Sequence, residues 1–81
     1  MEKIQSFKVD LIREKEGAYT AVVPLLPGCI SYGRTVEEAT KNAKEAIELH
    51  LENLEAHNQP VPEEETPLVF TTLIQVTHPR V

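Results

Sequence analysis

The chain has 81 residues, 41% of them hydrophobic and 26% charged, and this size supports one hydrophobic core, so we expect residues 1–81 to form a single domain. Thirteen acidic and eight basic residues give a net charge of -5, which argues against binding to a nucleic-acid backbone and favours a basic partner. The single cysteine excludes an internal disulfide, and no apolar run is long enough to cross a bilayer, so we expect a cytoplasmic protein without a membrane segment.

The N-terminal third of the chain predicts a β-hairpin. Residues 4–13 alternate apolar and polar side chains with the period of two that is typical of a half-buried strand. Residues 14–17 form a polar turn that ends in glycine, and residues 18–23 alternate again as the returning strand. Pro24 ends that strand because proline has no N–H for the ladder.

A tight turn and a short strand follow. Pro27 fixes φ at the first central position of a type II turn, and Gly28 tolerates the positive φ that the second position needs. Residues 29–33 are long enough for a third strand, and Gly33 leads out of it. The three segments predict an antiparallel meander.

Thr35 and Glu38 form a capping box that predicts the start of a helix. The Thr35 hydroxyl can accept from the Glu38 N–H while the Glu38 carboxylate accepts from the Thr35 N–H. Apolar residues then recur at steps of three and four, which indicates an amphipathic helix packed flat on the sheet. Asn58 and Pro60 end the helix.

The last part of the chain predicts a solvated connection and a fourth strand. Residues 58–67 contain three prolines and the consecutive glutamates 63–65, without a usable period. Residues 68–77 are rich in β-branched side chains and predict a strand. The order β-β-β-α-β predicts an α+β domain, an antiparallel sheet with one helix on one face. We expect self-association through the uncovered sheet face or an edge strand.

The stretch from residue 24 to residue 47 resembles the HicB family of antitoxins, which carry a P-x-L-P-G-C turn followed by G-x-T-x-E-E-A and N-A-x-E-A-I. The matching residues are Pro24, Leu26, Pro27, Gly28, Cys29, Gly33, Thr35, Glu37, Glu38, Ala39, Asn42, Ala43, Glu45, Ala46 and Ile47. The resemblance weakens after about residue 58. The sequence departs from the family at Leu25 and Arg34, two positions that are often acidic in it.

This resemblance implies a partial ribonuclease-H-like fold and a non-enzymatic role. HicB proteins neutralise HicA toxins, small basic proteins that cleave mRNA, by binding over the active surface of the toxin. Many of them continue into a DNA-binding domain, and since the present sequence stops after the predicted fourth strand, we expect no direct DNA binding. We therefore expect a basic HicA-like toxin as partner and a homodimer or tetramer as the assembly.

Two residues could suggest catalysis. Cys29 could be a nucleophile, but it has no His or Asp near it in the sequence, and a small packed side chain is the favoured interpretation. Asp10 lies in a strand where a ribonuclease-H-like enzyme would hold metal, yet metal-assisted cleavage needs several converging carboxylates, which the other strands do not supply. We expect neither catalytic residues nor a cofactor.

The spacing of the three histidines only weakly indicates a metal site. His50 and His57 are seven residues apart, too far for ligation from adjacent helical turns, and His78 would have to come from the last strand. Packed histidines, or histidines that favour the helix dipole, are the simpler interpretation.

Acidic residues gather on the second half of the predicted helix. They are Glu45, Glu48, Glu52 and Glu55, followed by the glutamates 63–65. They either form a solvated face that keeps the protein soluble or complement a basic toxin. We predict an antitoxin that inhibits a HicA-like toxin by forming a protein complex, with Glu45, Glu48, Glu52 and Glu55 as possible contact residues. The alternatives are a stand-alone module that binds a small ligand or nucleic acid without a toxin partner, and a degenerate nuclease.

Overall fold

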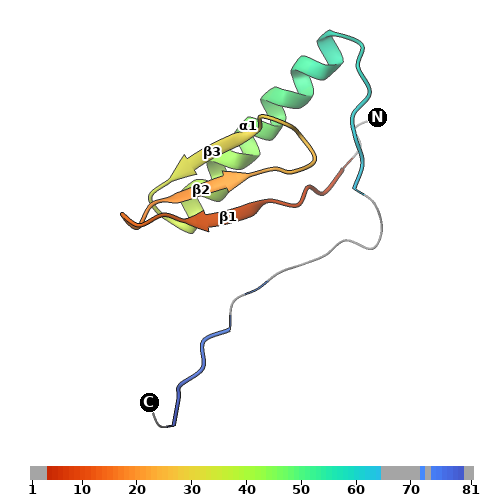
Figure 1. Ribbon diagram of the computed structural model, residues 1–81. Coiled ribbons are helices and arrows are strands. Elements are labelled where there is room, and N and C mark those ends of the chain that lie inside the picture. Colours follow the sequence, from red (N-terminus) through yellow and green to blue (C-terminus); the bar gives the residue numbers. More distant parts are fainter. Residues whose placement is uncertain (1–3, 65–71, 73, 80–81) are drawn as a thin grey trace.

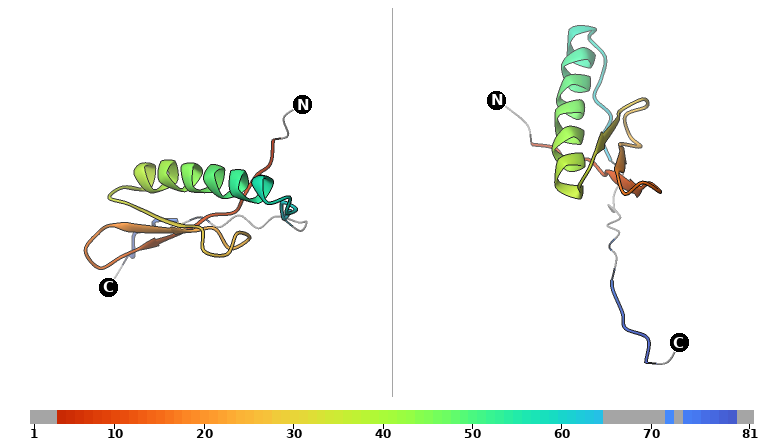
Figure 2. Two further views of the ribbon diagram at one scale, coloured as in Figure 1. Left: turned by 90° about the horizontal axis from the view of Figure 1, so that it is seen from above. Right: turned by 90° about the vertical axis from the view of Figure 1, so that its left-hand side faces the viewer.

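The structure is a computed structural model that describes residues 4–64, 72 and 74–79. Within these residues three strands, β1 (Asp10–Arg13), β2 (Tyr19–Val22) and β3 (Ile30–Gly33), precede one helix, α1 (Val36–Ala56). The strands form one antiparallel sheet in the order β1-β2-β3, and α1 covers one of its faces (Figure 1, Figure 2). The predicted α+β class is confirmed. No helix of the described part is long and apolar enough to cross a membrane.

The predicted fourth strand, residues 68–77, lies partly outside the described residues, to which 68–71 and 73 do not belong. The described residues 72 and 74–77 are exposed and belong to no strand. The described sheet therefore has three strands, with β1 and β3 as its edges.

The first strand is shorter than the predicted range 4–13. Residues 4–9 keep the alternation of exposed and half-buried side chains, but only Asp10–Arg13 pair with β2. The reason is the end of β2. Asp10 is opposite Val22, so Val9 would face Val23 and Lys8 would face Pro24, which has no N–H to extend the ladder. Residues 4–9 therefore continue toward the N-terminus without pairing to β2.

The core between sheet and helix is small and aliphatic. One cluster consists of Ala21 from β2 with Ala39 and Ala43 from α1. The other consists of Val23, Leu26 and Cys29, and half-buried side chains that include Phe7 and Ile47 pack against it. The small side chains of these three alanines let the helix approach the sheet closely.

Sheet and helix approach each other closely at Gly33. A Cβ atom built on Gly33 would lie 2.7 Å from Ala39 Cα and 2.8 Å from the carbonyl carbon of Glu38, far inside van der Waals contact. Nearby, the Asn42 side-chain amide donates a hydrogen bond of 2.6 Å to the backbone carbonyl of Tyr32. Gly33 and Asn42 thus fix the first half of α1 against the edge strand β3.

Two consecutive turns connect β2 and β3. Leu26 N–H donates to the Val23 carbonyl at 3.1 Å, and Cys29 N–H donates to the Leu26 carbonyl at 3.0 Å around Pro27 and Gly28. Gly28 has φ +83°, as a type II turn requires. The Val23 N–H then bonds to the Cys29 carbonyl at 3.1 Å and closes the loop, so that Leu26 points into the core.

Side chains and turn geometry define both ends of α1. Thr35 is the N-cap, and its hydroxyl accepts from Glu38 N–H at 3.0 Å. The Glu38 carboxylate accepts from Arg34 N–H at 2.9 Å, and not from Thr35 N–H as the capping box predicts. At the other end Asn58 has φ +53°, and its N–H bonds to the Glu55 carbonyl at 3.1 Å, a Schellman ending.

Candidate partner-binding surface

The four predicted glutamates, Glu45, Glu48, Glu52 and Glu55, are all exposed on α1. Their spacing of three and four residues places them on one side of the helix, the acidic stripe. Within the described part of the chain none of them makes an ion pair. The stripe is thus a solvent-facing row of carboxylates that is available to a partner.

The position of the acidic stripe is electrostatically unfavourable for the isolated helix. The last turn of α1 contains no basic residue, and Glu52 and Glu55 lie near its negative dipole end. A cation placed there from outside would improve both the charge balance and the dipole interaction.

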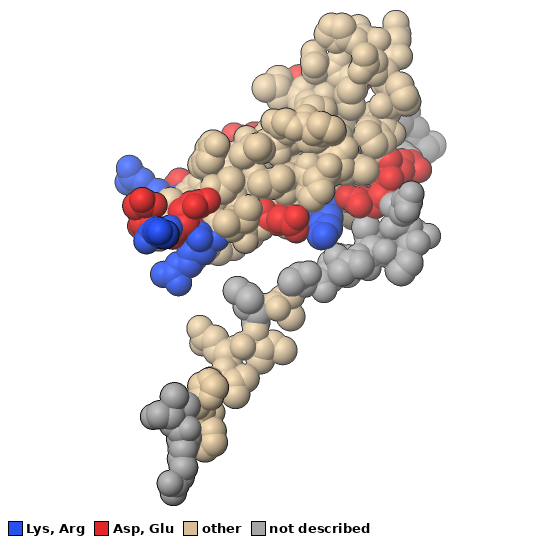
Figure 3. All heavy atoms as spheres, viewed as in Figure 1, with Lys and Arg blue, Asp and Glu red and all other residues tan. Residues whose placement is uncertain are grey.

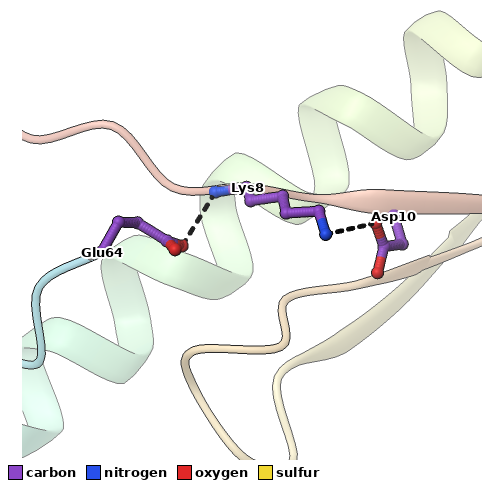
Figure 4. A network of polar contacts seen from close by, with 3 residues as sticks. All are labelled: Lys8, Asp10 and Glu64. Atoms are coloured by element: carbon purple, nitrogen blue, oxygen red, sulfur yellow. Dashed lines mark hydrogen bonds and ion pairs between the residues drawn. The ribbon is translucent and has the colours of Figure 1, made fainter. Parts of the chain in front are cut away.

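The acidic connection has a partly structural role. The Glu64 carboxylate accepts a hydrogen bond of 3.2 Å from the backbone N–H of Lys8, while the Lys8 ammonium lies 3.9 Å from the Asp10 carboxylate (Figure 4). The Gln5 side chain also donates to the Pro62 carbonyl at 2.8 Å. These bonds hold the end of the connection beside the N-terminal segment. Glu65 lies outside the described residues.

A groove of about 1070 Å³ runs between α1 and residues 4–9. Apolar side chains line most of it, with Glu48 and Glu55 of the acidic stripe on the α1 side and Gln59, Val61 and Glu63 from the connection. The apolar lining residues are Ile4, Phe7, Val9, Ala43, Ile47, Leu51 and Val61. We call it the α1 groove; it combines an apolar lining with a mainly acidic rim.

The sheet face opposite α1 is a second candidate surface. The strand register brings Ile12 and Tyr32 into one row across the sheet and Val22 and Ile30 into the next. Ile12, Ile30 and Tyr32 are 48%, 47% and 66% exposed. Charged side chains on this side lie at the hairpin end and along the β1 side, which leaves the rest of the face uncharged (Figure 3).

Cys29 and Asp10, the two residues that could suggest catalysis, lie in different surroundings, one buried and one exposed. Cys29 is buried with Val23 and Leu26, and this burial raises the pKa of its thiol above the ordinary value, which keeps it in the neutral form. Asp10 is exposed in β1 and pairs with Lys8. These positions fit packing and surface roles.

The histidines do not converge. His50 is half-buried on α1, His57 forms the C-cap, with its Nδ1 2.8 Å from the Asn53 carbonyl, and His78 is exposed. Within the described residues no group of three or more His, Cys, Asp or Glu side chains is arranged to hold a metal ion.

Sequence patterns alone did not reveal the α1 groove or the Asn42 bond to β3. Both depend on which segments meet in space. The signal for the open sheet face was present in the sequence, because Ile30 and Tyr32 alternate with Cys29 and Ser31 in a strand with apolar residues on both sides.

Comparison with known proteins gives a consistent family. Residues 7–73 match the family described as HicB-like antitoxin of bacterial toxin-antitoxin systems. A UPF0150 protein of Synechocystis sp. is 48% identical over 79% of this chain and 81% of its own length, and one of Thermoplasma acidophilum is 41% identical over 69% and 81%. The N-terminal domain of the Burkholderia pseudomallei antitoxin HicB superposes with a TM-score of 0.61 at 30% identity, over 82% of this chain and 72% of that one. With the three-stranded meander and the covering helix, these matches show that the chain belongs to the HicB-like antitoxin family.

Proposed function

We propose that this protein neutralises a basic, HicA-like mRNA-cleaving toxin by binding to it, and that the acidic stripe on α1 is a main part of the contact. The observation that carries the proposal is the row of exposed, unpaired carboxylates in a position that the helix dipole disfavours. A toxin that binds RNA must present basic side chains, and a carboxylate row can compete for them. Such a complex would form in the cytoplasm, where the mRNA is.

The proposed role is inhibition by association, without catalysis and without direct binding to DNA. The net charge of -5 would oppose approach to a phosphate backbone. Any effect on DNA would then run through a partner in the complex. A homodimer or tetramer is compatible with this role, since a second copy would double the number of acidic stripes.

The test is co-expression with a short basic protein encoded beside this chain, followed by binding kinetics at low and high salt. The variant Glu48→Lys with Glu52→Lys should slow association at low salt at least about 10-fold, because rim charges act mainly on the association rate. The matched control, Glu16→Lys with Glu37→Lys, makes the same change in net charge away from the acidic stripe and should change the rate much less.

Two outcomes would count against the proposal. If the neighbouring basic protein neither co-purifies with this chain nor loses its toxicity, the stand-alone binding module becomes the better interpretation. If both pairs of variants slow association equally, net charge matters and the acidic stripe does not.

A further inference from the structure

We propose that the α1 groove receives an apolar anchor of the basic partner, a surface segment in which neighbouring aliphatic or aromatic side chains are flanked by Lys or Arg. The acidic stripe attracts this segment and the groove retains it. The inference rests on the proposed function, because it states which chemistry the partner must present beside the acidic stripe.

A row of exposed carboxylates does not by itself hold a partner for long. Ion pairs that remain in contact with water contribute little to affinity, since water and salt screen them, and they act mainly on the association rate. Long-lived complexes depend on a few large side chains that leave water completely at the centre of the interface. The surface that supplies this second contribution should therefore lie beside the acidic stripe.

The α1 groove adjoins the acidic stripe directly, because Glu48 and Glu55 belong to both. Its volume of about 1070 Å³ is at the upper end of the usual range of ligand pockets, about 300–1,000 Å³, so it has room for several side chains. Leu51 lines the groove from α1 and is half-buried, while Ile4 at its margin is 97% exposed. Apolar side chains that face water in this way gain free energy when a partner covers them.

Charge decides which apolar segment fits the groove. The described lining contains three glutamates, Glu48, Glu55 and Glu63, and one basic residue, Lys44. An acidic segment would meet like charges on this rim, whereas Lys or Arg on either side of an apolar anchor would meet opposite ones. The uncovered sheet face lacks this selectivity, because basic and acidic side chains mix at its hairpin end (Figure 3).

The wall of the groove opposite α1 is held in place before a partner arrives. The Gln5 side-chain amide donates to the Pro62 carbonyl at 2.8 Å, and Lys8 N–H donates to the Glu64 carboxylate at 3.2 Å. Phe7, between these two bonds, packs against the core. This wall has little conformational freedom left to lose on binding, which favours affinity.

The first test compares how fast the complex with the neighbouring basic protein dissociates. Leu51→Asn should raise the dissociation rate about 10-fold or more, because the anchor loses an apolar contact in the groove. Leu49→Asn is the matched control, since Leu49 lies on the same helix, is 67% exposed and is not among the lining residues. It should change the rate much less. Leu51 is not among the side chains of the two core clusters, so both variants should keep the fold, which circular dichroism checks.

Lys44 gives a test in the opposite direction. Lys44→Gln removes the basic residue of the described lining and should raise the association rate at low salt about 3-fold, because Lys44 repels the Lys or Arg that flanks the anchor. Lys15→Gln makes the same change in net charge in the exposed turn at 14–17 and should raise the rate less. Equal effects of the two variants would mean that net charge acts and the charge of the groove does not, which would overturn the proposed selection by charge.

A synthetic peptide tests the groove without the toxin. Isotope-labelled full-length protein is titrated with a peptide of alternating leucine and lysine, and with a peptide of alternating serine and lysine of equal length. The leucine peptide should shift the amide resonances of Ile4, Val9 and Leu51, and Leu51→Asn should weaken its binding about 10-fold. The serine peptide has the same charge and should shift mainly the acidic stripe. Shifts confined to the uncovered sheet face would overturn the proposal.

The outcomes separate this inference from the proposed function. If the basic protein does not bind at all, both fail. If it binds and substitutions in the acidic stripe slow its association, but Leu51→Asn and Leu49→Asn dissociate alike, the proposed function stands and the groove inference fails.

Two other occupants of the groove would also overturn the inference. If Leu51→Asn lowers the mass of the protein in solution and leaves binding of the basic protein unchanged, a second copy occupies the groove. If the leucine peptide binds there only after Ile74→Ser with Val76→Ser, the C-terminal segment of the same chain occupies it.

Discussion

At the scale of single residues, Gly33 is required because there is no room for a side chain, and not because of its backbone angle. Its φ is not positive, yet the position of a Cβ atom is already occupied by the backbone of Ala39 at the start of α1. The whole first turn of the helix would have to move away from β3 to admit a methyl group. Neighbouring contacts, including the Asn42 bond to Tyr32, would move with it.

We therefore predict that Gly33→Ala lowers the free energy of unfolding by about 1–3 kcal/mol, the usual cost of overpacking. Denaturant titration followed by circular dichroism measures it. Gly17→Asn is the matched control, because Gly17 has φ +89°, which Asn tolerates, and nothing lies within 4 Å of an added Cβ. The control should stay within about 0.5 kcal/mol of the wild type. Equal stability of Gly33→Ala and the wild type would contradict the close approach.

Cys29 links stability to pH through its buried thiol. Because burial raises the pKa of this thiol in the folded state, the unfolded chain ionises first as the pH increases. Its contribution to stability is thus complete below the unfolded pKa and is lost as the pH rises through the folded one. We predict that stability falls above about pH 9, and that Cys29→Ala, compared with the wild type at each pH, falls less steeply. Parallel unfolding curves for the two proteins from neutral pH to pH 10 would exclude the thiol as the cause.

At the scale of the elements, the helix α1 covers the sheet, and specific residues define both of its ends. The Thr35 cap and the Schellman ending at Asn58 define where the helix begins and ends. The ending also directs residues 59–64 back beside the N-terminal segment, where Gln5 and Lys8 hold them.

Asn58 tests this ending. Asn58→Ala should destabilise the protein by about 1 kcal/mol, because an alanine in the left-handed region carries a steric cost that glycine avoids. Asn58→Gly removes the same side chain but permits φ +53°, so it should be neutral or slightly stabilising. Thermal unfolding of both variants gives the comparison. If alanine and glycine have the same effect, the positive φ is not what the position selects for.

The sequence predicted those features whose signals are local. The turn at Pro27 and Gly28, the cap at Thr35 and the stop at Asn58 each depend on residues within a few positions of one another. The sequence predicted too long a first strand, residues 4–13. The length of β1 depends on where its partner β2 ends, and Pro24, just after β2, has no N–H for the ladder. For the candidate surface, the sequence predicted that acidic residues gather on the second half of the helix, and the structure shows four of them as one exposed row. The α1 groove, by contrast, depends on the placement of residues 4–9 against the helix, which no short-range pattern encodes.

At the scale of the whole molecule, negative charge is unevenly distributed. The acidic stripe gathers four carboxylates on the second half of α1 in a protein with a net charge of -5, and none of the four makes an ion pair within the described part of the chain. Mutual repulsion of these groups weakens the isolated protein, while the same field attracts a basic partner from a distance. The two effects should respond to salt in opposite directions.

We predict that raising the salt concentration from about 0.01 M to about 1 M, which shortens the Debye length from about 30 Å to about 3 Å, raises the melting temperature of the isolated protein and weakens its complex with a basic toxin. Replacing Glu48, Glu52 and Glu55 by Gln should reduce the salt dependence of both quantities. A melting temperature that falls with salt would mean that attractive charge pairs dominate, contrary to the charge distribution described above.

The double turn between β2 and β3 also bears on how the protein can be altered. Three hydrogen bonds close this loop, and Leu26 from it is buried in the core. An extra residue between Val23 and Cys29 would therefore displace Leu26 from its position. The turn at 14–17 has an exposed tip and is anchored only by Glu14, so it can lengthen outward. A fluorescent label or an epitope sequence therefore belongs in the first connection of the sheet, and the second should be left as it is.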